Sequence, residues 1–152
     1  MILGVNATKS AIVIAETRGT GGRFAISALR LISFEVCSGN DLAQLLRSLT
    51  EMFDRHHQIA KPTIALLKCS SGRFGSCLEA IKGEAIIELA AFQLGLPVTK
   101  IAPQSLKKAL GCPPGQKWQK RATELFNPDG LVKNWSKGAV GAVAVAFKLA
   151  AS

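Results

Sequence analysis

The chain has 152 residues, of which 48% are hydrophobic and 19% charged, with 19 Lys and Arg against 10 Asp and Glu. This size and composition indicate a single globular domain over residues 1–152 and exclude a disordered chain. The net charge of +9 favours a polyanionic or acidic partner, with solubility alone as the plainer explanation.

The N-terminal third of the chain predicts three strands joined by short connections. Residues 2–5 and 11–15 are short apolar runs, and residues 24–34 alternate between apolar and polar side chains. The loop RGTGG at 18–22 is rich in glycine, as hairpin loops are. These features together indicate an antiparallel meander.

Helices and strands alternate after the meander. The capping residues at 38–41 precede leucines at helical spacing and predict an amphipathic helix. The run TIALL at 63–67 predicts a fourth strand, and 98–101 predicts a fifth. The helix between these two strands is expected to carry one apolar stripe. The stripe consists of Ile81, Ala85, Leu89 and Phe92.

Three more helices are expected after the fifth strand, over residues 104–110, 117–126 and 136–150. Three antiparallel strands followed by alternating helices and strands predict an α/β fold. Its five-stranded mixed sheet has three antiparallel strands and then two parallel ones, flanked by helices on both faces.

The cysteines and the apolar segments narrow the class of protein further. None of the four cysteines has the CxxC spacing typical of zinc sites. The opening MILGVN indicates a strand rather than a signal peptide, and the apolar stretch at 138–147 is too short to span a bilayer. We therefore expect no metal, no cofactor and no membrane partner, and a reducing, cytoplasmic location.

Four segments carry a family resemblance that covers nearly the whole chain. They are MILGVNATKSAIVIAE, KPTIALLK, GEAIIELAAFQLGLPVTKIAPQSLKKALG and SKGAVGAVAVAFKLA. In this order they resemble the RuvC family of Holliday-junction resolvases, within the RNase H-like superfamily. The resemblance implies an RNase H-like fold.

The resemblance also implies where catalytic acids would stand. The family's first strand ends in an Asp, its fourth strand ends in a Glu, and its last helix carries two Asp three residues apart. This sequence has Asn6, Lys68, Gly138 and Gly141 at those positions. Since the catalytic metals need converging oxygen ligands, we predict a pseudonuclease without catalytic residues or a metal site.

A second group of residues is expected to bind nucleic acid. Lys68 either holds a phosphate where the metal would sit, or neutralises a carboxylate or points to solvent. Basic residues also gather after the fifth strand around one tryptophan, which suits a groove that follows a nucleic-acid backbone, although a solvated surface would look similar. The candidates are Lys9, Lys68, Arg73, Phe74, Lys107, Lys108, Lys117, Trp118, Lys120 and Arg121.

The leading hypothesis is a catalytically inactive RuvC-like domain that binds structured or branched DNA, or RNA, as part of a larger complex. One alternative is a protein-interaction module or homodimer, with small residues of the last helix either receiving another chain or packing on their own sheet. Another is a metal-dependent nuclease with a relocated site, for which Glu84 and Glu88 share a helix face. The small residues are Gly138, Gly141, Ala142 and Ala146.

Overall fold

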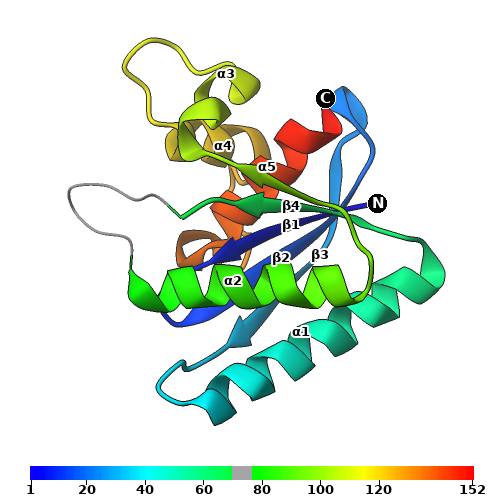
Figure 1. The fold of residues 1–152 in the computed structure, drawn as a ribbon. Helices are drawn as coiled ribbons and strands as arrows, with labels where there is room; N and C mark the ends of the chain where they lie inside the picture. The colour runs from blue at the N-terminus through cyan, green and yellow to red at the C-terminus, as the bar shows by residue number, and fades with distance from the viewer. Residues whose placement is uncertain (70–76) are drawn as a thin grey trace.

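The computed structural model describes residues 1–69 and 77–152, and within them five strands form one sheet between two layers of helices (Figure 1). The spatial order of the strands is β3-β2-β1-β4-β5. The pairs β1–β2 and β2–β3 are antiparallel, and β1–β4 and β4–β5 are parallel. The predicted α/β fold with a mixed sheet is therefore confirmed. The strands are β1 (Ile2–Ala7), β2 (Ala11–Arg18), β3 (Ala25–Ser33), β4 (Thr63–Leu67) and β5 (Val98–Ile101).

Two helices cover one face of the sheet and three lie on the other (Figure 1). The first face carries α1 and α2, and α1 begins as predicted, with the Ser38 hydroxyl accepting from the Asp41 backbone N–H at 3.2 Å. Within the described residues no helix is both long enough and apolar enough to cross a membrane. The helices are α1 (Gly39–Ile59), α2 (Leu78–Gln93), α3 (Leu106–Leu110), α4 (Trp118–Phe126) and α5 (Ala139–Ala150).

The alternation of side chains along the central strands sorts the core into two parts. On β1, Leu3 and Val5 point toward α1 and α2, where they pack in one buried cluster with Leu49 and Phe53. Gly4 and Asn6 alternate with them and point toward α5. Each fully buried Leu or Phe contributes about 1.5–3 kcal/mol to the stability of the fold, because its apolar surface is removed from water. The end of β1 thus presents Asn6 on the α5 side of the sheet.

The last helix lies unusually close to the first strand. A Cβ placed on Gly4 would stand 1.8 Å from the carbonyl oxygen of Ala142 and 2.9 Å from the Cβ of Ala146. Both alanines are fully buried. The small residues of α5 therefore pack against their own sheet, and the hypothesis that they receive a second chain is wrong.

The packed face of α2 is not the face that carries the apolar stripe. Ile81, Leu89 and Phe92 are 44%, 41% and 81% exposed, so the predicted stripe faces outward. Instead, α2 packs against the sheet through the face that carries its small residues, because the helix and the sheet lie too close together for larger side chains. A Cβ on Gly83 would already lie 3.3 Å from the Cβ of Ala7. This packing leaves an apolar stripe uncovered on α2. The face toward the sheet consists of Ala80, Gly83, Glu84, Ile87, Ala90 and Ala91.

Candidate nucleic-acid interface

A cleft with two chambers opens at the carboxyl ends of β1 and β4, the place where parallel sheets commonly bind ligands. The chambers measure about 470 and 640 Å³, and Asn6, Leu67, Trp118 and Gln119 line both. The smaller one, the β4 chamber, is also lined by Ala7, Lys68, Cys69, Cys77, Ala80, Pro103, Gln104 and Lys107. The larger one, the α5 chamber, is also lined by Thr8, Lys9, Ser10, Ala11, Leu31, Ser33, Asn134, Ser136, Lys137, Gly138, Val140 and Gly141.

Three of the positions that the resemblance assigns to catalytic acids meet in this cleft. The Asn6 side chain donates from Nδ2 to the carbonyl oxygen of Gly138 at 3.0 Å. A Cβ on Gly141 would stand 2.6 Å from the same Nδ2. Gly138 has φ +123°, which favours glycine, and a Cβ there would lie 3.0 Å from Thr8. The space that aspartates at 138 and 141 would need is already filled.

The fourth of these positions, at the end of β4, lies one residue earlier in the chain than predicted. The register Val5↔Leu66 places Leu67 beside Asn6, and a Cβ on Gly141 would lie 2.8 Å from Leu67 Cδ2. Leu67, not Lys68, is therefore the β4 residue that faces Asn6 and Gly141. A shift of one residue along a strand moves a side chain to the opposite face. Lys68 is exposed and lines the β4 chamber.

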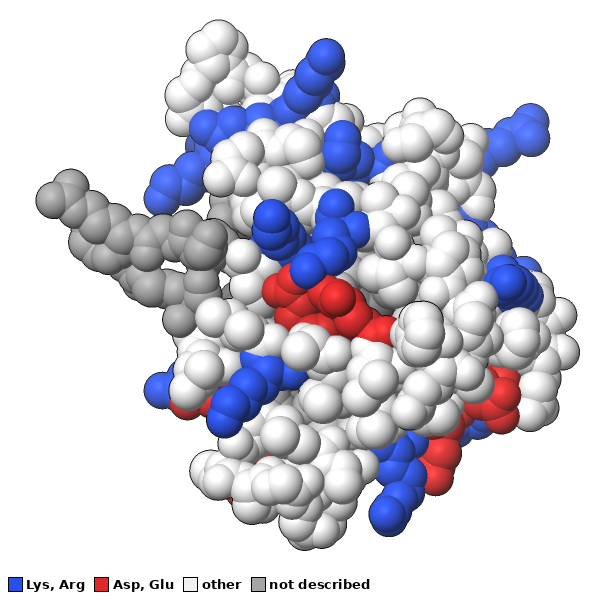
Figure 2. Space-filling model, viewed as in Figure 1, with Lys and Arg blue, Asp and Glu red and all other residues white. Residues whose placement is uncertain are grey.

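The charged side chains that line the described part of the cleft are all lysines. Lys68 and Lys107 line the β4 chamber and Lys9 and Lys137 line the α5 chamber, and neither set of described lining residues contains Asp or Glu. Figure 2 shows further cations over the half of the molecule that carries α3 and α4. Clefts lined by one sign of charge concentrate counter-charged ligands. The arrangement is suited to a polyanion.

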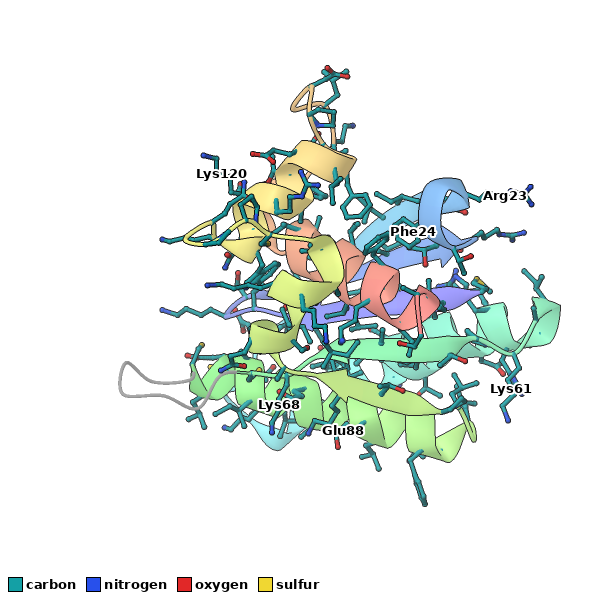
Figure 3. All side chains as sticks on the ribbon, turned by 90° about the horizontal axis from the view of Figure 1, so that it is seen from above. Arg23, Phe24, Lys61, Lys68, Glu88 and Lys120 are labelled. Carbon is teal, nitrogen blue, oxygen red and sulfur yellow. The ribbon has the colours of Figure 1, made fainter. Side chains whose placement is uncertain are left out.

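The remaining predicted binding residues are spread more widely. Lys108, Lys117 and Lys120 are exposed on or beside α3 and α4 but line neither chamber, and Lys120 lies well away from Lys68 (Figure 3). Arg121 donates from Nε to the carbonyl oxygen of Leu110 at 3.1 Å and pairs with Glu124 at 3.4 Å, so it fastens α4 to α3. The predicted residues Arg73 and Phe74 lie outside the described residues.

Sequence reasoning missed Lys137 and the turn that positions it. Asn134 adopts a left-handed conformation with φ 59°, which asparagine tolerates, and its carbonyl oxygen accepts from the backbone N–H of Lys137 at 3.0 Å. This turn places Lys137 in the α5 chamber. The adjacency of Lys137 to Gly138, already assigned to the site, is the signal that would have found it.

The two glutamates considered for a relocated metal site are held by a lysine instead. Lys100 of β5 contacts Glu84 at 3.0 Å and Glu88 at 2.6 Å. Glu84 also accepts from the Cys69 backbone N–H at 2.9 Å. Burial acts to raise the pKa of Glu84, but the hydrogen bonds from Cys69 and Lys100 outweigh it and hold the pKa below its ordinary value. Within the ranges that the structure describes, no three His, Cys, Asp or Glu gather as metal ligands would.

The same surroundings keep Cys69 unreactive. Burial, together with the hydrogen bond and negative charge of Glu84, raises the pKa of the Cys69 thiol to about 12. Since the thiolate is the nucleophilic form, this cysteine stays protonated at neutral pH. Thiol catalysis by Cys69 is not supported by this site.

Removing the shared lysine should make stability less sensitive to acid. We expect Lys100→Met to lower the free energy of unfolding at pH 7 by about 1 kcal/mol, because Lys100 is partly exposed while Glu84 is nearly buried. The lowered pKa of Glu84 stabilises the fold above the unfolded value of about 4.3, and this stabilisation is lost as pH falls through the folded value. Urea unfolding at about pH 7 and pH 3 should show a smaller acid loss in Lys100→Met than in the control Lys61→Met. Equal pH dependence in the two variants would contradict the account.

The sheet order and the helices on its two faces match the α/β fold of RuvC, an RNase H-like fold. The chain is similar to RuvC of T. thermophilus in complex with Holliday junction substrate, with a TM-score of 0.72 and 12% identity over 97% of this chain and 90% of that one. It is also similar to another Thermus thermophilus RuvC structure, with a TM-score of 0.68 and 13% identity over 97% and 91% of the two chains. Neither a model of a protein family nor a curated protein matches the sequence.

Proposed function

We propose that the protein binds structured or branched nucleic acid through the two-chambered cleft without cutting it. The observation that carries this proposal is the convergence of Lys9, Lys68, Lys107 and Lys137 on a cleft, with no Asp or Glu among the lining residues that lie in 1–69 and 77–152. Lysine binds phosphate as a point charge and tolerates any base sequence. The similar fold of T. thermophilus RuvC, which is in complex with Holliday junction substrate, favours DNA over RNA.

The proposed lack of cutting is supported by the side chains at the four positions. Mg²⁺ requires several oxygen ligands in near-octahedral geometry. Leu67, Gly138 and Gly141 offer no side-chain oxygen, and the amide of Asn6 is hydrogen-bonded to Gly138 through its nitrogen. One neutral amide oxygen is too weak a ligand set for metal-assisted hydrolysis.

Restoring acids at the two strand positions should not restore cutting. We expect the double variant Asn6→Asp, Leu67→Glu to leave a four-way DNA junction intact in Mg²⁺ or Mn²⁺, since α5 still contributes no carboxylate. The assay is a denaturing gel of labelled junction strands. Metal-dependent product from the wild-type chain would overturn the proposed lack of activity, and product from the variant alone would show that α5 ligands are dispensable.

The binding proposal is tested by a native gel with the full chain and four labelled probes. The probes are a four-way junction, a continuous duplex, a single strand and an RNA hairpin, each at about 50 and 200 mM salt. We expect retardation at low salt, strongest for the junction, that weakens at higher salt because released counterions drive the binding. No complex with any probe at low salt would overturn the proposal.

A second proposal, that the protein pairs with a copy of itself, is favoured by the exposed stripe on α2. In an antiparallel pair of helices with a twofold axis at Ala85, Leu78 would face Phe92, since each lies seven residues from Ala85. By the same count Ile81 faces Leu89. The stripe is thus self-complementary in its apolar residues, as a twofold interface requires. The small side chain of Ala85 would let the two helices come close.

Sedimentation of the full chain at several concentrations tests the pairing. We expect a dimer for the wild-type chain and a monomer for Ala85→Arg. An arginine at the twofold axis would lie opposite the same arginine of the second chain, and the two like charges would repel. Ala43→Arg, on the exposed side of α1, is the matched control and should leave the dimer intact. A wild-type monomer at tens of micromolar, or equal effects of the two arginines, would contradict the pairing.

A further inference from the structure

The β4 chamber has the dimensions and walls of a small-molecule site rather than of a backbone groove. Its volume of about 470 Å³ lies within the range of about 300–1,000 Å³ that such sites occupy. Leu67, Ala80, Pro103 and Trp118 give it apolar walls from four different elements or loops. A double helix is too wide to enter this space, whereas one nucleotide is of suitable size.

Trp118 is the aromatic side chain of this wall, and it is partly exposed while one side packs on the core. The other tryptophan, Trp135, donates its indole N–H to Thr123 at 2.8 Å and packs in the core beside α5. Trp118 is only partly buried, and within the described residues its indole N–H has no hydrogen-bond partner. Trp118 is the first residue of α4, and Arg121 joins this helix to the end of α3. The wall that presents Trp118 is therefore held in place.

Polar groups surround the apolar walls in a pattern that suits a base and its phosphate. The amide nitrogen of Asn6 donates to the carbonyl oxygen of Gly138, and this leaves the amide oxygen to accept from an N–H of a ligand. Gln104 and Gln119 add amides that both donate and accept. Lys68 and Lys107 supply positive charge to the same chamber.

We infer that the β4 chamber holds a single unpaired nucleotide, with its base against Trp118 and its phosphate at Lys68 and Lys107. The inference rests on the proposed function and sharpens it, because it names the feature of the nucleic acid that is selected. Taking a base out of a helix costs stacking and pairing energy, and this cost is smallest where the base is already unpaired. Stacking on an aromatic ring accepts any base, so the selectivity is for unpaired structure and not for sequence.

The test compares two DNA probes of the same length, a continuous duplex and a duplex with one bulged nucleotide, by fluorescence anisotropy. We expect the wild-type chain to bind the bulged probe at least about fivefold more tightly, as stacking of one base on an aromatic side chain implies. Trp118→Leu should lower the affinity for the bulged probe at least about fivefold more than the affinity for the duplex, so that the preference disappears. Trp118→Phe keeps an aromatic face and should retain most of the preference.

A second readout uses the intrinsic fluorescence of Trp118. In a Trp135→Phe background Trp118 is the only tryptophan, and its emission should be quenched by the bulged probe and not by the duplex. Equal binding of both probes, or equal loss of both in Trp118→Leu, would overturn this inference and leave cleft binding standing. If the wild-type chain binds neither the bulged probe nor the duplex, the proposed function is overturned as well.

Discussion

The variant with glutamine at Lys9, Lys107 and Lys137 should bind DNA about two to three orders of magnitude more weakly than the wild type at 0.1 M salt. These lysines line the cleft from three separate segments. Each phosphate contact contributes about 0.9 to the slope of log affinity against log salt, so losing three contacts lowers the slope by about 2.7. Anisotropy titrations across a salt series measure both quantities.

A control with the same change in net charge separates the cleft from charge alone. Lys61, Lys133 and Lys148 line neither chamber, and Lys61 lies at the far end of the molecule from Lys68 (Figure 3). Glutamine at these three positions should change the affinity and its salt slope only slightly. If the two triple variants lose affinity equally, net charge explains the binding and the cleft does not.

The largest effect on stability is expected for Gly4→Ala, which should lower the free energy of unfolding by about 3 kcal/mol or prevent folding. A Cβ at this position would stand 1.8 Å from the Ala142 carbonyl oxygen, so β1 and α5 must separate. The atoms that this Cβ would meet, the Ala142 carbonyl oxygen and the Ala146 Cβ, do not lie at the end of a flexible side chain. The clash also shifts α5, which carries Gly141 and follows directly after Gly138, and with it one wall of the α5 chamber. Urea unfolding followed by circular dichroism measures the loss.

Gly39→Ala is the matched control for this substitution. Gly39 begins α1, and a Cβ there meets nothing within 4 Å. Alanine at an unstrained glycine position is neutral or stabilises by about 0.4–1 kcal/mol, because it restricts the unfolded chain. Similar losses for the two variants would show that the contact between β1 and α5 is not the cause.

The fold could be predicted because local patterns and chain order agree. The fourth strand was predicted over 63–67 and occupies Thr63–Leu67, since an apolar run bounded by Pro62 and Lys68 leaves little freedom in its ends. The cap at Ser38 was likewise correct, because its hydrogen bond to Asp41 is local. Short connections then restrict how three strands and the following alternation of helices and strands can be arranged.

The packing of α2 could not be predicted, because periodicity tells which residues share a helix face and not which face the sheet takes. The stripe carries the large side chains Ile81, Leu89 and Phe92, but the close approach at Gly83 places the small residues against the sheet. That distance depends on contacts far apart in sequence, such as the one between Gly83 and Ala7.

The site was predicted in part for a similar reason. Asn6, Gly138 and Gly141 do come together, yet the residue of β4 that joins them is Leu67 and not Lys68. A family pattern locates a strand end to within a residue or so, whereas the two faces of a strand alternate at every residue. The cluster of lysines in the cleft depends on the register of β1 and β4 and on the turn at Asn134, neither of which leaves a clear sequence signal.

The most direct test of the central claim is a titration of a labelled four-way junction with the wild-type chain in Mg²⁺, from about 50 to 400 mM salt. With four lysines in the cleft, we expect a log–log salt slope of about −3.6 or steeper, and junction strands recovered intact afterwards. No binding at the lowest salt, an affinity that does not depend on salt, or cleaved strands would contradict it.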